Sequence, residues 1–371
     1  DPCRSRGLGD VYKRQILILA CSNDYEIVCV DVVKLSSLPA TNITRTSATL
    51  NGVIDYTSLN CDVPSIANQG FVYSTQREPT TENSIVNVGV GSINITIENL
   101  ESNTTYYFRT FLTNASGNFY ADKNREIRRF TTHVNDEPSN CDVVYLGENG
   151  ISIKACESSN VGDVGTINGT EYTVVSEPDL RQMIVNNADI SSVCTSRVTY
   201  MEKLFYQNYV FSQDISSWDV SNVTSMSQMF EEAAFNQDIS NWDVRNLTDM
   251  FAMFKNNSAF NQPLENWNVS SVIKMGRMFE GNSAFNQPIN NWDVSSVDEM
   301  WYMFFNASNF NQPIGDWDVS SVANMYSMFS GSSFNQALGD WDVRNVLQCD
   351  GFSYNTPQWT LPQPNFTNCT P

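Results

Sequence analysis

The sequence predicts a multidomain chain: an all-β sandwich followed by an α/β solenoid, with a parallel sheet on one side and short helices on the other. The chain has 371 residues, enough for about two or three domains. Residues 35–132 alternate apolar and polar side chains with the period of a β-strand. Tryptophans then recur every 24 or 25 residues, which indicates a repeat array; they are Trp218, Trp242, Trp267, Trp292, Trp317 and Trp341.

Composition narrows the functional classes. The 21 basic and 41 acidic residues give a net charge of −20, which excludes a nucleic-acid partner, because affinity for phosphate is built on Lys and Arg. The single histidine, His133, excludes multi-histidine metal sites. No phosphate-binding loop, dinucleotide fingerprint or Gly-x-Ser-x-Gly elbow occurs. We therefore expect a secreted or surface-displayed binding protein and not an enzyme.

The N-terminus predicts a lipid anchor. Residues 1–15 are basic, have no apolar periodicity, and resemble translated adapter sequence, so they are left out of the fold prediction. In residues 16–34, a five-residue apolar run ends at Cys21, too short for a bilayer span of about 20 residues. The run resembles the end of a bacterial lipoprotein signal, followed by an acidic tether. That resemblance implies acylation of Cys21 and attachment to the outer face of the outer membrane; the alternative is a buried strand.

Residues 35–132 are expected to form the sandwich. Ile93, Ile95 and Ile97 alternate with polar residues, as in a strand with one buried face. The stretch from Leu100 to Tyr106 resembles the fibronectin type III pattern, which implies a corner role for Tyr106 and a spacer role for the domain. Residues 133–140 are predicted to be a linker with a solvated His133.

Residues 141–189 are expected to cap the repeats. Asn149-Gly150 and Asn168-Gly169 predict the turns of two hairpins. A helix is predicted to begin at Glu177, with Pro178 in its first turn.

The repeats occupy residues 190–353 and a C-terminal cap or tail follows at 354–371. The Ile-x-x-Trp-x-Val segment predicts the strand, and Val223, Met226, Met229 and Phe230 predict one face of a helix after Ser221 as N-cap. Asparagines such as Asn236 are expected to stack inside the turns and bond backbone groups of adjacent coils. The tryptophans named above are assigned to the core, together with Met229, Met253, Met278, Met303 and Met328.

The repeated Phe-Asn-Gln…Trp-Asp-Val…Met-Phe unit resembles the 25- or 26-residue repeats of bacterial surface proteins. This leucine-rich-repeat-like group includes BspA-type adhesins and mycoplasma lipoprotein-associated repeats. The resemblance implies adhesion or protein–protein contact with an unknown protein or with a host or matrix ligand. Two alternatives are a carbohydrate-binding component of a polysaccharide-capturing surface system and a structural stalk without a ligand.

One polar side chain per repeat is expected on the open face of the sheet. Neighbours would lie about 5 Å apart and repel by only about 0.8 kcal/mol per pair in water. These residues are predicted first to brace the following turn or remain solvated, second to bind a basic or polyvalent partner, and third to bind Ca²⁺; no other cofactor is expected. We call them the Asp column: Asp219, Asp243, Asn268, Asp293, Asp318 and Asp342.

Nine cysteines occur. Without Cys3 and the lipidation candidate Cys21, an odd number is left for disulfides. The expected pairs are Cys156–Cys194, Cys349–Cys369 and Cys29–Cys61, which leaves Cys141 over; other pairings remain open. No Cys-x-x-Cys spacing occurs, so no metal site is expected.

Overall fold

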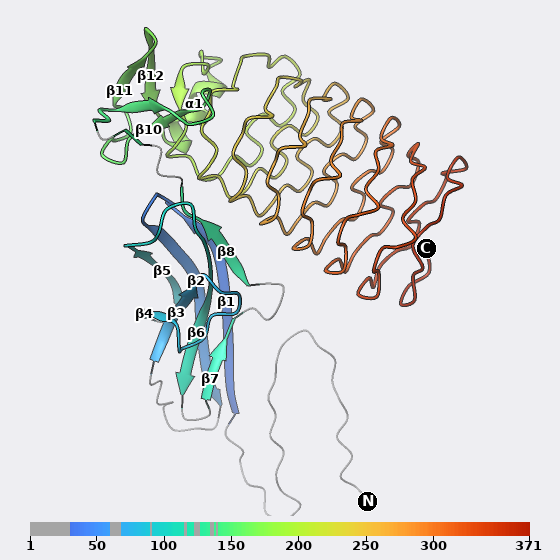
Figure 1. Ribbon diagram of the computed structural model, residues 1–371, viewed down its shortest axis with the longest axis horizontal. Helices are drawn as coiled ribbons and strands as arrows, with labels where there is room; N and C mark the ends of the chain where they lie inside the picture. Colours follow the sequence, from blue (N-terminus) through green and yellow to red (C-terminus); the bar gives the residue numbers. More distant parts are fainter. Residues whose placement is uncertain are drawn as a thin grey trace, which may run out of the picture.

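The computed structural model describes residues 30–59, 68–89, 91–114, 117–121, 127–133, 137–138 and 140–371 (Figure 1). Residues 1–15, Cys21 and the predicted Cys29–Cys61 pair lie outside this part of the chain. Among the described residues, no helix has the length and apolar character needed to cross a bilayer.

The N-terminal part is a sandwich of two antiparallel sheets. One sheet has the order β1-β2-β5, formed by Val30–Thr41, Ala48–Leu59 and Gly91–Ile97. The other has the order β4-β3-β6-β7, formed by Ser84–Asn87, Asn68–Ser74, Thr105–Asn114 and Gly117–Tyr120. Strand β8 (Arg128–Thr131) also pairs with β6. The alternating pattern of the sequence therefore produces two faces that bury apolar side chains against each other.

Aromatic side chains fill the core of the sandwich. Phe71, Phe108 and Phe130 are almost fully buried. The ring of Tyr106 stacks on Phe130 at 5.7 Å, and its hydroxyl oxygen accepts a hydrogen bond of 3.0 Å from the backbone N–H of Glu101. This bond ties the start of β6 to the preceding turn.

A small mixed region caps the repeats. Strands β9 (Val144–Leu146) and β10 (Ile153–Ala155) form one hairpin. Strands β11 (Val164–Ile167) and β12 (Thr170–Val174) form another, to which β13 (Val193–Cys194) adds in parallel. Helix α1 (Glu177–Val185) begins after Ser176, whose side chain and that of Asp179 make a capping box. A parallel bridge from Ile153 to Trp218 joins the cap to the first complete repeat.

The predicted parallel sheet and helices of the repeats are wrong. Among the described residues the last strand is β13, and the strands of the chain belong mainly to small antiparallel sheets. Residues 195–352 instead form stacked coils built from consecutive turns, which we call the stack (Figure 1). Neighbouring coils are joined by single parallel bridges along one column of residues: Tyr200, Ser225, Asp249, Lys274, Glu299, Asn324 and Gln348.

Backbone bonding explains why no helix forms. The N–H groups of Met226, Gln228 and Phe230 donate to carbonyls of the next coil at 2.8–3.0 Å, so they are not available for bonds within a helix. The N–H of Met229 closes a turn onto Met226. Methionines three residues apart thus share one side of a series of turns, as they would on a helix.

Left-handed residues recur in every coil and also interrupt a helix. One such column has φ between 54° and 68° and consists of Gln207, Glu232, Asn256, Gly281, Asn306, Gly331 and Asn355. Five of these seven residues are Asn or Gly, which adopt this conformation most readily. This column is the sequence signal that argued against a helix.

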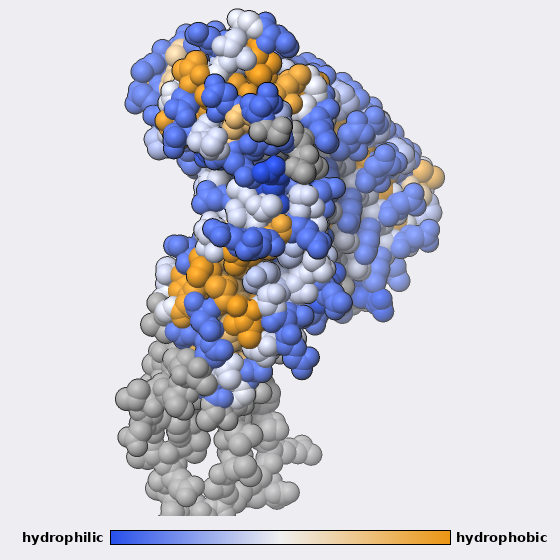
Figure 2. Space-filling view, turned by 60° about the vertical axis from the view of Figure 1, so that its left-hand side comes forward, coloured by the Kyte–Doolittle hydropathy of each residue, from blue (hydrophilic) through white to orange (hydrophobic). Residues whose placement is uncertain are grey.

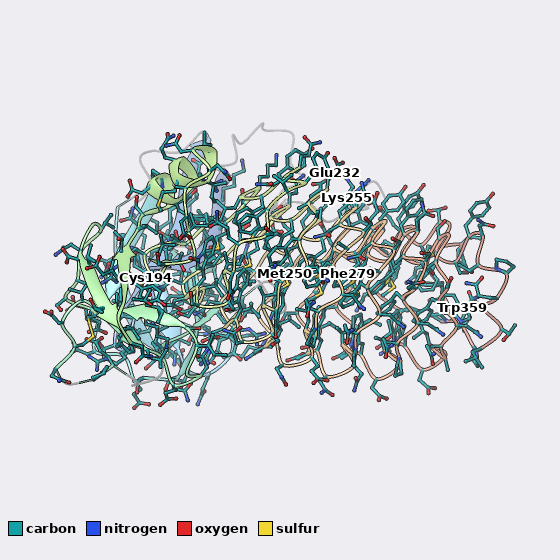
Figure 3. The ribbon with its side chains drawn as sticks, turned by 90° about the horizontal axis from the view of Figure 1, so that it is seen from above. Cys194, Glu232, Met250, Lys255, Phe279 and Trp359 are labelled. Atoms are coloured by element: carbon teal, nitrogen blue, oxygen red, sulfur yellow. A yellow bond between two sulfur atoms is a disulfide. The ribbon has the colours of Figure 1, made fainter. Side chains whose placement is uncertain are left out.

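The stack has one continuous core. The six repeated tryptophans are at most 5% exposed, and the methionines assigned to the core are fully buried. Each indole N–H donates to a backbone carbonyl of the preceding coil at 2.9–3.2 Å. Figure 3 shows Met250 and Phe279 inside the stack and Glu232 and Lys255 at its edge. Neighbouring coils therefore share both apolar contacts and directional bonds.

The asparagine series forms a ladder at the surface, whereas the sequence predicted it inside the turns. The side-chain oxygen of Asn261 accepts from the N–H of Asn286 at 2.9 Å, and Asn286 accepts from Asn311 at 3.0 Å. Asn286 and Asn311 are exposed. The ladder connects backbone groups of adjacent coils from the outside.

The sandwich lies against the first coils of the stack. The backbone N–H of Thr131 in β8 donates to Asn246 Oδ1 at 2.9 Å, and Asn246 Nδ2 donates back to the Thr131 carbonyl at 3.2 Å. Arg245 donates to Asn103 Oδ1 at 3.1 Å. Figure 1 shows β8 on the side of the sandwich that faces the stack. The sandwich and the first coils of the stack are therefore in direct contact.

Candidate functional site

The Asp column braces turns along the stack. In each of its six members Oδ1 accepts the backbone N–H of the residue two positions later, at 3.0–3.3 Å. At Asp293 the hydroxyl of Ser295 also donates, at 2.6 Å. At Asp243 and Asp342 an arginine replaces the serine and donates its Nε at 2.8 Å. This is the geometry of an Asx turn, the first of the roles considered for the column.

The column is not equally open along its length. Asp219 was expected on the open face, but it is 4% exposed, and its second oxygen accepts from the hydroxyl of Ser196. Asp243 and Asp342 are half-buried, and each contacts an arginine. Asn268, Asp293 and Asp318 are exposed. The open part of the Asp column therefore begins at Asn268 and includes Asp293, although Arg129 of the sandwich still reaches Ser296 in the coil of Asp293, at 3.3 Å.

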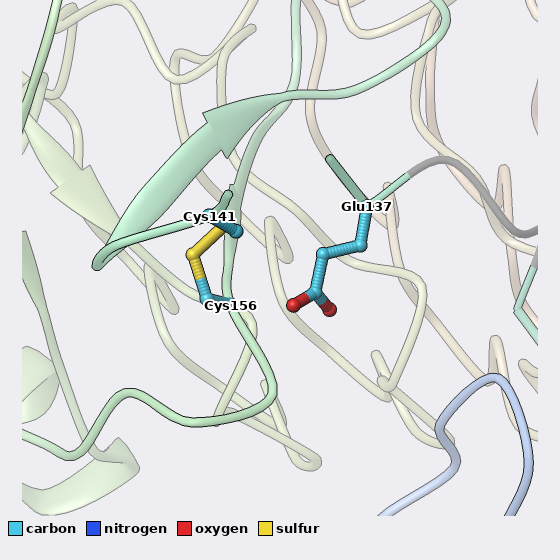
Figure 4. Close-up of side chains that lie close together, drawn as sticks. All are labelled: Glu137, Cys141 and Cys156. Carbon is cyan, nitrogen blue, oxygen red and sulfur yellow. A yellow bond between two sulfur atoms is a disulfide. The ribbon is translucent and has the colours of Figure 1, made fainter. Parts of the chain in front are cut away.

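The column does not assemble a cation site. Among the described residues, the one group of three potential ligands within 4.8 Å of one another is Glu137, Cys141 and Cys156 (Figure 4). Both of its cysteines are joined in a disulfide, so neither offers a thiolate to a metal. The described carboxylates of the Asp column form no such cluster.

Two disulfides secure the ends of the repeat region. Cys349 bonds to Cys369, the pair predicted for the C-terminal cap. The predicted Cys156–Cys194 pair is wrong, because Cys156 bonds to Cys141 across the β9–β10 hairpin, with a Cα separation of 5.9 Å. Cys194 is free and buried in the cap, where burial raises the pKa of its thiol to about 11. Cys141, which the sequence prediction left unpaired, therefore forms a disulfide.

A small polar cavity lies where the sandwich, cap and first coil meet. Its volume is about 30 Å³, and His133, Asp219 and Asn222 are among its lining residues. His133 Nε2 and Asn222 Oδ1 are shielded from solvent and have no hydrogen-bond partner within the described part of the chain. A polar cavity of this size is large enough for a water molecule.

His133 was predicted to be solvated, and the structure shows otherwise. Its backbone N–H and carbonyl bond to Thr44 and Asn103 of the sandwich, so the imidazole is carried into the junction. Burial lowers the pKa of His133, against a smaller raising effect of the nearby Asp219 carboxylate. The burial of His133 could not be predicted from its neighbours in the sequence, because Asn222 and Asp219, which line the same cavity, are distant in the chain.

Fold and column together define the class of the molecule: a two-sheet sandwich packed on a capped stack of 24- or 25-residue coils. The repeats match the model of a family described as a Mycoplasma protein of unknown function, DUF285, over residues 178–282 and 261–362.

Among solved structures, the sensor domain of the anti-sigma factor RsgI4 from Pseudobacteroides cellulosolvens is similar, at 24% identity. The similarity covers 28% of this chain and 95% of that domain, with a TM-score of 0.20. No curated protein sequence matches the chain.

Proposed function

We propose that the chain is a non-catalytic bacterial surface lipoprotein whose stack mediates adhesion or protein–protein contact. The match of the repeats to a repeat-containing mycoplasma family supports this proposal, as does the resemblance of the unit to BspA-type adhesins. In this proposal Cys21 carries the lipid anchor, and the sandwich is of the fibronectin type III class. The strand order of the two sheets and the hydroxyl contact of Tyr106 support the latter assignment.

The observation that carries the proposal is the open part of the Asp column. Asp293 and Asp318 are exposed on adjacent coils, beside indoles whose centres are 6.4 Å apart. Two carboxylates spaced like these indoles would repel by only about 0.6 kcal/mol in water. A partner that excludes water strengthens this repulsion, so the column favours a partner that brings positive charge. Figure 2 shows that the visible part of the stack is largely hydrophilic, whereas apolar patches lie on the sandwich and cap.

One member of the Asp column is already uncharged, which shows how to test the contribution of the negative charges to binding. Asn268 occupies the same column and makes the same bonds to Ser270, so asparagine preserves the turn. The variant Asp293→Asn/Asp318→Asn therefore removes two charges without removing the brace. Binding to immobilised fibronectin, laminin and whole host cells is measured, and we expect at least a tenfold loss.

The matched control changes two exposed carboxylates that lie off the column, one in the coil of Asp318 and one in the following coil, Asp316→Asn/Asp340→Asn. This control should bind as the unmodified protein does. Equal binding by all three proteins would remove the Asp column from the proposal. Absence of palmitate labelling in cells, with Cys21→Ser as reference, would remove the lipid anchor.

A further inference from the structure

One outward column of the stack does not repeat. Inward positions carry the same or a similar residue in coil after coil. The position after the first methionine, which is Cys349 in the last coil, instead reads Ser227, Phe251, Gly276, Trp301, Tyr326 and Asp350. Stacking does not dictate the residue type here, since coils with serine, glycine and tryptophan at this position all stack. Large aromatic residues in such a column require another explanation.

Five aromatic side chains gather around this column, and we call them the aromatic platform: Phe251, Trp301, Tyr302, Phe305 and Tyr326. The ring of Tyr302 meets Phe305 at 4.9 Å and Tyr326 at 5.2 Å, both edge-on. Trp301 lies 5.6 Å from Phe251, two coils away in the sequence. The platform therefore runs along the stack across several coils.

The preceding coil holds the indole of Trp301 in place. A Cβ added at Gly276 would lie 2.8 Å from Trp301 Nε1, so the indole rests directly on the glycine. The guanidinium of Arg277 lies 4.6 Å from the centre of Trp301 and 4.7 Å from that of Tyr302. Such fixed rings lose little freedom when a ligand binds.

By itself, the platform is smaller than an ordinary protein interface. Tyr326 is 38% exposed, and the other four side chains are only half-buried at the surface. With about 150–250 Å² for each aromatic side chain, the accessible area is below about 500 Å². A stable protein interface buries about 800 Å² on each partner.

Charge and chemistry point to a neutral ligand. Arg277 is paired with Glu280 at 2.9 Å, so it offers no unpaired cation, and the net charge of −20 disfavours anionic ligands. Aromatic faces bind flat apolar surfaces, while the tyrosine hydroxyls and neighbouring polar groups bind hydroxyls. A pyranose ring has both features, an apolar C–H face and a polar edge. We propose that the aromatic platform binds a neutral oligosaccharide or polysaccharide chain lying along the stack, at a site separate from the Asp column.

Trp301 gives this proposal its own spectroscopic signal. It is the one half-buried tryptophan of eight, because the other seven are at most 7% exposed. The full chain is titrated with laminarin, xyloglucan, galactomannan and soluble starch, with polygalacturonate as the anionic comparison. We expect at least one neutral glycan to change the tryptophan emission and to protect it from acrylamide quenching.

Two variants locate the binding. Trp301→Ala removes the indole, and Gly276→Ala keeps every aromatic ring but displaces the indole by its added methyl group. Each should weaken binding at least tenfold, measured by calorimetry. Tyr354→Ala and Tyr209→Ala, which remove exposed aromatic rings outside the platform, should bind as the unmodified chain does.

The outcomes separate the possibilities. The proposal is wrong if none of the four neutral glycans binds, if polygalacturonate binds best, or if Trp301→Ala binds with unchanged affinity. Loss of protein adhesion instead of glycan binding in Trp301→Ala would also overturn it and assign the platform to a protein partner. Asp293→Asn/Asp318→Asn should retain full glycan binding, so failure of this inference and failure of the adhesion proposal are distinguishable.

Discussion

The sandwich and the stack reach a buried core by different routes. In the sandwich, contacts join segments far apart in the chain, such as the hydrogen bond between Ser37 and Thr110, 73 residues away. In the stack, bonds between neighbouring coils join residues 22 to 28 positions apart, as between Trp292 and Leu264. The sandwich is therefore expected to unfold as one unit, whereas the stability of the stack is close to a sum over coils and their interfaces. All eight tryptophans lie between residues 218 and 359, so their fluorescence reports on the stack and its C-terminal cap.

The largest effect should come from removing one indole. Trp292→Ala creates a cavity and leaves the Leu264 carbonyl without its donor, which we expect to cost about 3–5 kcal/mol. Urea unfolding followed by tryptophan fluorescence measures this loss. Phe71→Ala makes a cavity in the core of the sandwich and should leave the fluorescence midpoint almost unchanged. Equal shifts in both variants would show that the two parts unfold as one.

Opening the C-terminal disulfide tests whether the ends of the stack limit its stability. Cys369→Ser removes a bridge over 20 residues, with an expected cost of about 3 kcal/mol. Hydrogen exchange should accelerate first in the last coil and the following residues, which pack on it through Trp359 and Phe366. Cys141→Ser opens the other bridge and should accelerate exchange in the cap. Uniform acceleration along the stack would argue against coil-by-coil stability.

A single asparagine tests the coupling of the two parts. Asn246→Ala removes both bonds to Thr131 and should cost about 1–3 kcal/mol, with an increase in the radius of gyration measured by X-ray scattering. Asn345 is the equivalent residue of the last coil; it bonds to Ser320 of the neighbouring coil and is exposed. Asn345→Ala should leave the scattering profile unchanged. An unchanged radius in Asn246→Ala would mean that other contacts hold the sandwich in place.

The smallest effect is pH-dependent and local to the junction. Because burial lowers the pKa of His133, the unfolded chain binds a proton more readily, and stability falls as pH decreases through the ordinary histidine range near 6.5. His133→Gln removes this titration. The Tm of the unmodified protein should therefore fall more between pH 7 and pH 5 than that of the variant. Parallel Tm curves would show that His133 titrates alike in both states.

The inward columns of the stack could be predicted because each coil repeats the same packing problem. Trp218 to Trp341 and the paired methionines were assigned to the core from spacing alone, and they are buried. The helix predicted in each repeat was wrong because methionines three residues apart fit a series of turns as well as a helix. The Asn and Gly residues at 256, 281, 306, 331 and 355 held the missing information.

Features that depend on distant segments could not be predicted. The burial of Asp219 and the position of His133 follow from the docking of the sandwich on the first coils, and Asn246 meets Thr131 across 115 residues. The aromatic platform escaped notice for the opposite reason. Its residues do not follow the repeat, and a search for periodicity passes over them.

The indole bond has a consequence for how such molecules change length. Each internal coil offers a carbonyl to the tryptophan of the next coil, and its own tryptophan donates to a carbonyl of the preceding coil. Both of its sides are therefore interchangeable with those of its neighbours. A gene duplication that inserts one whole unit would preserve every joint and leave the terminal caps untouched. The length of the stack can therefore evolve in fixed increments, without any redesign of its interior.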